Sequence, residues 1–197
     1  MVQENSYALL LSGDENRFAE EALRFQEYLV HEAKFDPSHI GIVFCTYAGT
    51  QYLLDETQAF FTRVRGEKPK ADVVVLFTGH GGKGSFFPNR SALGYRDMAQ
   101  LIAEHRGGVL FLNESCYSGS SVKAFEDVPA LGKRQVITSS QEDELTYGGI
   151  FLDRLVASYR WRLPFRRRTI GTVEIVGKQI VRSAQGDMPV RIEEGVE

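Results

Sequence analysis

Short apolar runs alternate with longer amphipathic stretches along most of this chain. The apolar runs are continuous rather than alternating, which is typical of strands buried on both faces of a parallel sheet. The clearest is Asp72 to Thr78, where Val73 to Phe77 are all apolar. The same pattern predicts strands at residues 7–11, 40–45, 108–113, 135–139 and, behind Pro189, 190–192.

The amphipathic stretches predict helices between these strands. From Asn16 to Ala33, apolar residues recur every three or four positions, which places them on one helical face. Asp14 stands just before this helix, where its side chain would cap the first turn. Similar spacing predicts further helices at residues 50–64, 95–104, 118–125, 148–159 and 169–184.

Strand and helix alternate almost throughout, which indicates a mostly parallel sheet with helices on both faces. We therefore expect a three-layer α/β fold with about six strands in the central sheet. The 197 residues contain no internal repeat and no composition break, so we expect a single domain over residues 1–197. A chain of this length buries enough surface to hold a core without a disulfide or a metal ion.

Two of the predicted strands end in residues suited to catalysis. The third strand is followed by Gly79-His80-Gly81-Gly82, and the fourth by Glu114-Ser115-Cys116. In an open α/β sheet, ligands bind beyond the carboxyl ends of the strands. Glycine on each side of His80 lets the backbone turn sharply and approach a substrate. A helix starting directly after Cys116 would stabilise a thiolate there through its positive end.

Cys116 and His80 form a candidate nucleophile and acid–base pair if the third and fourth strands are neighbours in the sheet. The backbone N–H groups of Gly81 and Cys116 would then donate to the oxyanion of a tetrahedral intermediate. A single Cys at a strand end usually serves packing, and a single His usually lies at the surface. Their joint occurrence at two successive strand ends indicates catalysis.

These two motifs resemble those of the caspase-like clan of cysteine peptidases, which contains caspases, metacaspases, legumains, gingipains and clostripain. The element order agrees from Tyr7 to about Ile192. The resemblance implies a caspase-like sheet, a Cys–His dyad without an obligatory third member, and hydrolysis through a thioester acyl-enzyme without an organic cofactor. Glu114, two positions before the nucleophile, makes the cysteine motif most similar to the metacaspase and legumain patterns.

Acidic residues gather at the same predicted edge of the sheet. The segment from Ile137 to Glu144 leaves the fifth strand there, where the resemblance implies a wall of the pocket for the residue before the scissile bond. An acidic pocket would favour Arg or Lys, while Asn or Asp stays an alternative. The alternative role of Glu114 is to accept backbone hydrogen bonds. The candidate substrate-binding residues are Asp14, Glu114, Ser139, Ser140, Glu142 and Glu144.

Charge and composition narrow the expected partners. The net charge of −3 gives no reason to expect nucleic acid or an anionic membrane. The exception is Arg160 to Arg168, a basic run that is either a solvated loop or a site for an anionic partner. With no secretory leader pattern and no run long enough to span a bilayer, we expect a cytoplasmic protein. Its expected partners are a polypeptide substrate and a regulatory protein.

The remaining Cys and His residues suggest no metal centre. Cys45 lies within a predicted strand and is expected to be inert core. His31, His39 and His105 stand beside charged or loop residues and are expected to be solvated. No Cys or His spacing is typical of zinc, although an acidic calcium site at residues 142–144 stays open.

The sequence leaves open how the protein is activated and whether it hydrolyses or joins peptides. Many members of the caspase-like clan are activated by cleavage of a long linker after the cysteine segment. The short stretch from Cys116 to Gln135 leaves no room for such a linker here. We expect the chain to act uncut or under a partner, an ion or a pro-segment, with Arg166 to Arg168 as the place of any cleavage. A catalytically silent scaffold and a transpeptidase or ligase using the same dyad are alternatives. A flavodoxin-like domain is less favoured, because the loop after the first strand is acidic.

Overall fold

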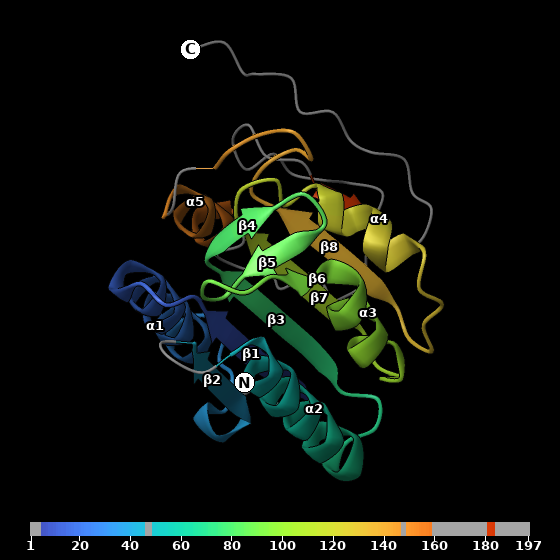
Figure 1. The fold of residues 1–197 in the computed structure, drawn as a ribbon. Helices are drawn as coiled ribbons and strands as arrows, with labels where there is room; N and C mark the ends of the chain where they lie inside the picture. The colour runs from blue at the N-terminus through green and yellow to red at the C-terminus, as the bar shows by residue number, and fades with distance from the viewer. Residues whose placement is uncertain (1–4, 46–48, 147–148, 159–180, 184–197) are drawn as a thin grey trace.

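A central six-stranded sheet organises the computed structural model, which describes residues 5–45, 49–146, 149–158 and 181–183 (Figure 1). The strand order is β2-β1-β3-β7-β8-β9. The first five strands are parallel, and β9 runs antiparallel to β8. The strands are β1 (Ser6–Ser12), β2 (Ile40–Phe44), β3 (Asp72–Thr78), β7 (Val109–Glu114), β8 (Arg134–Thr138) and β9 (Val181–Ser183).

Helices cover both faces of this sheet and complete three layers (Figure 1). Two of them, α1 (Asn16–His31) and α5 (Ile150–Ser158), pack on one face. The other face carries α2 (Thr50–Glu67), α3 (Tyr95–Ala103) and α4 (Ser120–Glu126). The short helix η1 (Pro37–His39) precedes β2. The predicted α/β fold with a mostly parallel sheet is therefore confirmed.

The continuous apolar strands arise because successive side chains enter opposite cores. In β1, Tyr7, Leu9 and Leu11 pack on the side of α2, whereas Ala8 and Leu10 pack on the side of α1. All five of these side chains are buried. A period of two with both faces covered leaves no polar position in the interior of the strand, which explains the pattern in the sequence.

The sheet order also fixes where a site can form. The chain passes from β1 outward to β2 and then returns to place β3 on the other side of β1. The carboxyl ends of β1 and β3 therefore lie at the point where the strand order reverses, which is where open α/β sheets bind ligands. The next neighbour of β3 is β7, whose end also lies at this edge.

A second, antiparallel sheet replaces the predicted glycine-rich loop. It contains β4 (His80–Gly82), β5 (Ser85–Phe87) and β6 (Leu93–Gly94). Gly84 makes the tight turn between the first two strands with a φ of +79°. Phe86 fixes the sheet to the core by packing against the rings of Phe77 and Tyr95, at centroid distances of 4.2 and 4.4 Å. Strands of two or three residues are too short to show a periodicity.

Two predicted elements differ from the structure. The helix predicted over residues 169–184 is wrong at Val181–Ser183, which form β9. The free edge of β8 offers unpaired backbone groups, and pairing with them outweighs local helical spacing. The helix predicted from Ser118 begins at Ser120. The rest of residues 169–184, the strand predicted at 190–192 and the arginine-rich run at 160–168 lie outside the described residues.

The burial predicted for Cys45 and the exposure predicted for the three other histidines are confirmed only in part. Cys45 is buried as predicted, and burial raises the pKa of its thiol to about 11. His31 is exposed as predicted. The prediction for His105 is wrong, because its ring is fully buried and Nε2 donates to the carbonyl of Ala71 at 2.7 Å. His39 is half-buried and stacks on Tyr7 with the ring centroids 4.1 Å apart.

Candidate active site

The strands that precede His80 and Cys116 are direct neighbours. β3 and β7 pair in parallel, with Thr78 opposite Glu114 at their carboxyl ends. His80 and Cys116 each follow two residues after this last pair. The condition that the sequence set for a dyad, adjacent third and fourth strands, is therefore met by the structure.

The segment that carries His80 (residues 79–82, the histidine loop) and the turn that carries Cys116 (residues 116–119, the cysteine turn) are in direct contact. The amide of Gly79 donates to the carbonyl of Glu114 at 3.2 Å. A β-carbon added to Gly81 would lie 2.5 Å from Ser115 Oγ and would also overlap the carbonyl oxygen of Cys116. Only glycine allows the backbone at residue 81 to approach the carbonyl of Cys116 and the side chain of Ser115 this closely. The structure thus brings together Gly81 and Cys116, the two predicted oxyanion-hole residues.

His80 has an acidic partner that the sequence did not reveal. Oε1 of Glu15 lies 2.5 Å from His80 Nε2, and Arg17 Nε lies 2.6 Å from the other carboxylate oxygen. The ring of Phe18 meets the imidazole edge-on at 5.2 Å. The hydrogen bond with His80, followed by the charge of Arg17, lowers the pKa of Glu15. The only signal in the sequence was that Glu15 follows the first strand at the same sheet edge.

Asp14 does not cap α1. The N-cap residue is Glu15, and its side chain makes no capping hydrogen bond because it faces His80. Asp14 lies one residue too early and is exposed. The capping prediction is therefore wrong, while a substrate contact of Asp14 stays a prediction.

Cys116 lies half-buried in a turn rather than at the start of a helix. Residues 116–119 form this turn, in which Tyr117 has a φ of +56°, and α4 starts only at Ser120. The direct adjacency of Cys116 to a helix end is thus wrong. Its Sγ lies 3.8 Å from the carbonyl oxygen of Thr146, in the segment after β8.

Ser139 and Ser140, just after β8, form hydrogen bonds with the segment around Cys116. Both side chains are buried, and the two hydroxyls each donate to the carbonyl of Ser115 at 3.2 Å. The hydroxyl of Ser140 also accepts from the amide of Ser118 at 3.1 Å. These bonds join the end of β8 to the turn that carries Cys116. Contact of either serine with substrate stays a prediction.

The side chain of Ser115 contacts two further buried polar groups. Its hydroxyl donates to Asn113 Oδ1 at 2.8 Å and lies 3.3 Å from the hydroxyl of Tyr95. All three side chains are buried. The residue before the candidate nucleophile is therefore fixed through both its carbonyl and its side chain.

Glu114 makes the backbone contact that the sequence offered as its alternative role. Its side chain is 2% exposed, and Oε1 accepts from the amide of Gly149 at 2.9 Å. Burial, followed by the nearby charge of Glu21, raises the pKa of Glu114 to about 8. A direct contact with substrate stays a prediction.

The acidic segment after β8 lies against the cysteine turn. Glu142 and Glu144 are exposed, as is Asp143 between them. The amide of Tyr117 donates to the carbonyl of Glu144 at 2.7 Å, and Gly119 packs against the backbone at Gln141 and Glu142. Among the described residues, no three His, Cys, Asp or Glu side chains are placed to hold a metal ion.

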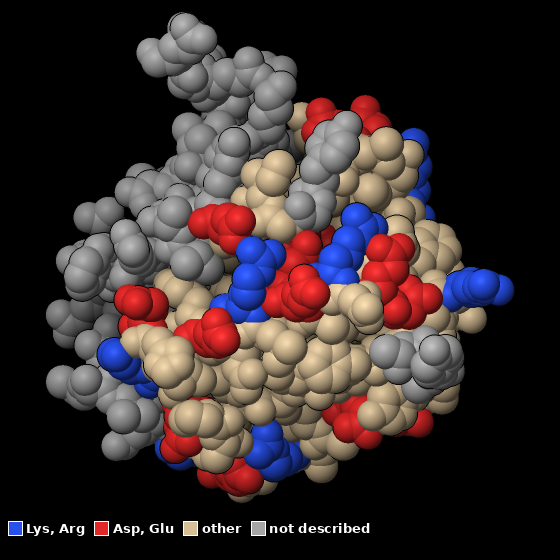
Figure 2. Space-filling model, turned by 90° about the vertical axis from the view of Figure 1, so that its left-hand side faces the viewer, with Lys and Arg blue, Asp and Glu red and all other residues tan. Residues whose placement is uncertain are grey.

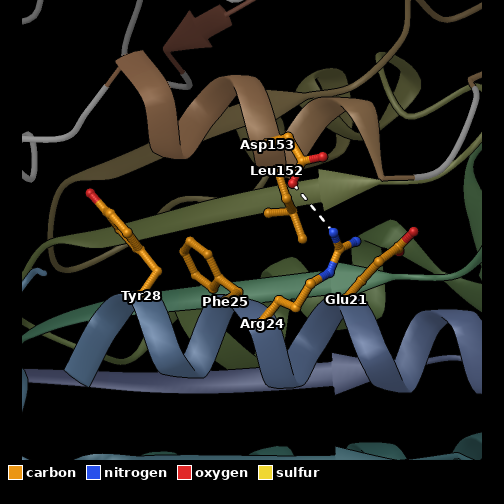
Figure 3. A pocket seen from close by; sticks show the side chains of 6 residues that line it. All are labelled: Glu21, Arg24, Phe25, Tyr28, Leu152 and Asp153. Atoms are coloured by element: carbon orange, nitrogen blue, oxygen red, sulfur yellow. Dashed lines mark hydrogen bonds and ion pairs between the residues drawn. The ribbon is translucent and has the colours of Figure 1, made fainter. Parts of the chain in front are cut away.

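A pocket of about 160 Å³ lies between α1 and α5, and neither His80 nor Cys116 lines it (Figure 3). Arg24 on α1 reaches Asp153 on α5 across it, with 3.5 Å between the charged atoms. The residues that line the pocket are Glu21, Arg24, Phe25, Tyr28, Leu152 and Asp153.

On the face of the molecule where these helices lie, acidic and basic side chains are interspersed, and neither sign dominates (Figure 2). None of the helices that the structure describes is long and apolar enough to cross a membrane.

The chain is similar to known proteins both in sequence and in fold. The model of the Peptidase C13 family matches residues 53–163, more than half of the chain and the part that contains both motifs. No curated protein sequence matches. The chain is similar to the structure of Raptor from Chaetomium thermophilum, with 11% identity and a TM-score of 0.50, over 78% of this chain and 17% of that one.

A second solved structure with similarity is a secreted C11 cysteine protease from Bacteroides thetaiotaomicron in complex with an irreversible peptide inhibitor. The identity is 17% and the TM-score 0.45, over 71% of this chain. The alignment covers 49% of that protease, so the present chain spans about half of its length.

Proposed function

Because this chain belongs to the peptidase C13 family, the legumain family of the caspase-like clan of cysteine peptidases, we propose that it is an endopeptidase that acts through Cys116 and His80. The packing of Gly81 on the carbonyl of Cys116 and the side chain of Ser115 carries the proposal, because it joins the histidine loop to the cysteine turn. Both lie beyond the paired ends of β3 and β7.

The first step is acylation of Cys116. The imidazole of His80 takes the thiol proton while the sulfur attacks the carbonyl carbon of the scissile bond. His80 Nε2 faces Glu15 at 2.5 Å, so Nδ1 is the nitrogen that takes the proton. The backbone amides of Gly81 and Cys116 donate to the oxyanion that forms. A β-carbon at residue 81 would push these two segments apart.

The second half of the reaction restores the enzyme. The tetrahedral intermediate collapses as the C–N bond breaks, and His80 returns its proton to the leaving amine. Water then attacks the thioester and gives a proton to His80, after which the C–S bond breaks and the thiolate is protonated again. The products are a new carboxylate and a new amine, with no cofactor consumed.

Glu15 orients His80 in this scheme. Its carboxylate accepts from Nε2, which fixes the tautomer with Nδ1 unprotonated, as proton transfer from the thiol requires. Arg17 holds the carboxylate in turn, and Phe18 limits rotation of the ring. Glu15 is therefore a positioning residue, because it acts through His80 rather than on the substrate.

Cleavage after a basic residue is the specificity that the surface charge supports best. Three exposed carboxylates, at residues 142–144, lie in the segment that packs on the cysteine turn. A cationic side chain held beside Cys116 would pair with them. Arg17 does not offset this charge, because it is paired with Glu15.

Fluorogenic peptides with Arg, Lys, Asn, Asp or Leu before the scissile bond test this function. We expect turnover that is abolished by Cys116→Ala and by His80→Ala, with Arg and Lys preferred. Circular dichroism of each variant controls for folding. Absence of any Cys116-dependent turnover would leave the scaffold alternative, and joining of an added amine in place of hydrolysis would identify a ligase.

A further inference from the structure

We propose that Ser120 is a positioning residue that holds the β4–β5 hairpin (residues 80–87), which carries His80, on the turn that carries Cys116. This proposal rests on the proposed function, because it concerns how the two candidate catalytic residues are held together. Ser120 acts here on the backbone of the two segments rather than on the reacting atoms.

A single hydroxyl joins the two segments. Ser120 Oγ accepts from the amide of Gly84 at 2.9 Å and donates to the carbonyl of Tyr117 at 2.7 Å. Gly84 lies in the turn at the tip of the hairpin, and Tyr117 directly follows Cys116. A serine hydroxyl has one hydrogen to donate and lone pairs that accept, so one side chain serves both bonds. The tip of the hairpin is thereby tied to the residue next to the candidate nucleophile.

The backbone at both ends of this connection has an unusual conformation. Tyr117 has a φ of +56°, which is uncommon for a residue other than glycine, and its carbonyl also accepts from the amide of Ser120 at 3.1 Å. Gly84 has a φ of +79°, which glycine adopts without steric cost. The carbonyl of Gly84 accepts from the amide of Tyr95 at 3.0 Å. The tip is therefore held from α3 by Tyr95, and Ser120 adds the bond that leads to the cysteine turn.

The bond to Ser120 complements the packing of Gly81 in the same hairpin. A β-carbon at residue 81 would overlap the carbonyl of Cys116, so this contact limits how closely the hairpin can approach the turn. Steric contact of this kind excludes closer positions but adds little attraction. The hydrogen bond from Gly84 to Ser120 limits how far the hairpin can move away. The two contacts together fix the orientation of the hairpin against the cysteine turn.

The hairpin needs this support because its strands are short. Three residue pairs join β4 and β5, and a two-stranded hairpin by itself is marginally stable in water. Phe86 anchors one face of the hairpin in the core. His80 is paired with Phe87, one position along from Phe86, and therefore lies on the opposite face. The bond at the tip opposes rocking of the hairpin about Phe86, a motion that would change the distance between His80 and Cys116.

Alkylation of Cys116 by iodoacetamide at pH 7 tests this role without a peptide substrate. We expect Ser120→Ala to slow the reaction about 5-fold, the factor that corresponds to the net contribution of one ordinary hydrogen bond. Ser120→Thr keeps the hydroxyl and should restore the wild-type rate. Ser121→Ala is the matched control and should react as wild type. Ser121 likewise donates to the carbonyl three residues back, that of Ser118 at 2.6 Å, but makes no hydrogen bond to the hairpin among the described residues.

The same change in His80→Ala protein separates positioning of His80 from a general loss of structure. If Ser120 acts through His80, Ser120→Ala should have no further effect on alkylation once the imidazole is absent. Equal slowing in both backgrounds would show that Ser120 only supports the cysteine turn and would overturn the proposal. A wild-type rate for Ser120→Ala would overturn it as well.

Two further measurements complete the test. Hydrogen exchange of the Gly84 amide, followed by NMR, should become faster in Ser120→Ala and stay unchanged in Ser121→Ala. With a peptide substrate, Ser120→Ala should lower kcat by about the same factor of 5 and leave KM nearly constant. Absence of peptide turnover in the wild type, together with intact coupling between Ser120 and His80 in the alkylation rates, would refute the peptidase function and leave the role of Ser120 in place.

Discussion

Glu15 Oε1 lies 2.5 Å from Nε2 of His80, so the loop after β1 meets the loop after β3 at the candidate site. Glu15→Gln should lower kcat by about 10-fold and leave KM nearly unchanged, because the amide holds the imidazole less firmly. Steady-state kinetics with a peptide substrate measure both constants. Glu20→Gln is the matched control and should behave as wild type. Equal kcat for Glu15→Gln and wild type would show that the contact has no role in positioning.

The two cysteines should differ sharply toward alkylating reagents. Cys116 is half-buried in a turn at the sheet edge, whereas Cys45 is fully buried. Burial raises the pKa of the Cys45 thiol to about 11, so little reactive thiolate forms there at neutral pH. Iodoacetamide at pH 7 should modify Cys116 alone, as read by peptide mass spectrometry. His80→Ala should slow this reaction, and rapid labelling of Cys45 in folded protein would contradict the assignment.

Gly81 should tolerate no side chain. In Gly81→Ala, the new β-carbon would overlap the carbonyl of Cys116 and the side chain of Ser115, so we expect kcat to fall by at least about 10-fold. Gly66→Ala is the control, since a β-carbon at Gly66 in α2 meets nothing within 4 Å. That change should raise the free energy of unfolding by roughly 0.5–1 kcal/mol. Full activity of Gly81→Ala would remove the main support for the proposed oxyanion hole.

The stability of the protein should fall between pH 6 and pH 8 because of Glu114. Folding raises the pKa of this carboxyl to about 8, whereas in the unfolded chain it has already lost its proton at pH 6. The folded state therefore holds one proton more than the unfolded state over this range. The free energy of unfolding should decrease by about 2 kcal/mol across it and level off by about pH 9.

Urea unfolding of wild type and Glu114→Gln at pH 6, 7, 8 and 9 measures this difference. The variant should lack the decrease that belongs to Glu114. Glu21, whose pKa burial also raises, contributes in the same direction in both proteins and largely cancels. Parallel curves for the two proteins would mean that Glu114 is ionised in the folded state at pH 6.

Neutralising the acidic segment should weaken any preference for basic substrates. In the double variant Glu142→Gln and Glu144→Gln, kcat/KM for a peptide with Arg before the scissile bond should fall about 3-fold to 10-fold. The same value for a Leu peptide should stay constant. Because both carboxylates are exposed, added salt should reduce the wild-type preference in the same way. An Arg preference that survives both treatments would place the specificity elsewhere.

The sequence determined the five parallel strands of the sheet and the location of the main motifs. Continuous apolar runs such as Val73 to Phe77, rich in β-branched residues, are typical of a strand covered on both faces, and polar residues beyond their ends mark the ligand-binding edge. Gly79-His80-Gly81 and Glu114-Ser115-Cys116 follow two such runs directly. Local pattern suffices here because strand burial and strand termination leave their marks at adjacent positions.

Only the tertiary structure decided which side chains meet. Glu15 reaches His80 because β1 and β3 are paired, and Glu114 reaches Gly149 because α5 returns to the end of β7. The burial of His105 against Ala71 and the pairing of β9 with β8 likewise depend on partners remote in the chain. Periodicity reports how one segment divides between core and solvent, whereas these contacts depend on the order of strands in the sheet, which no single segment encodes.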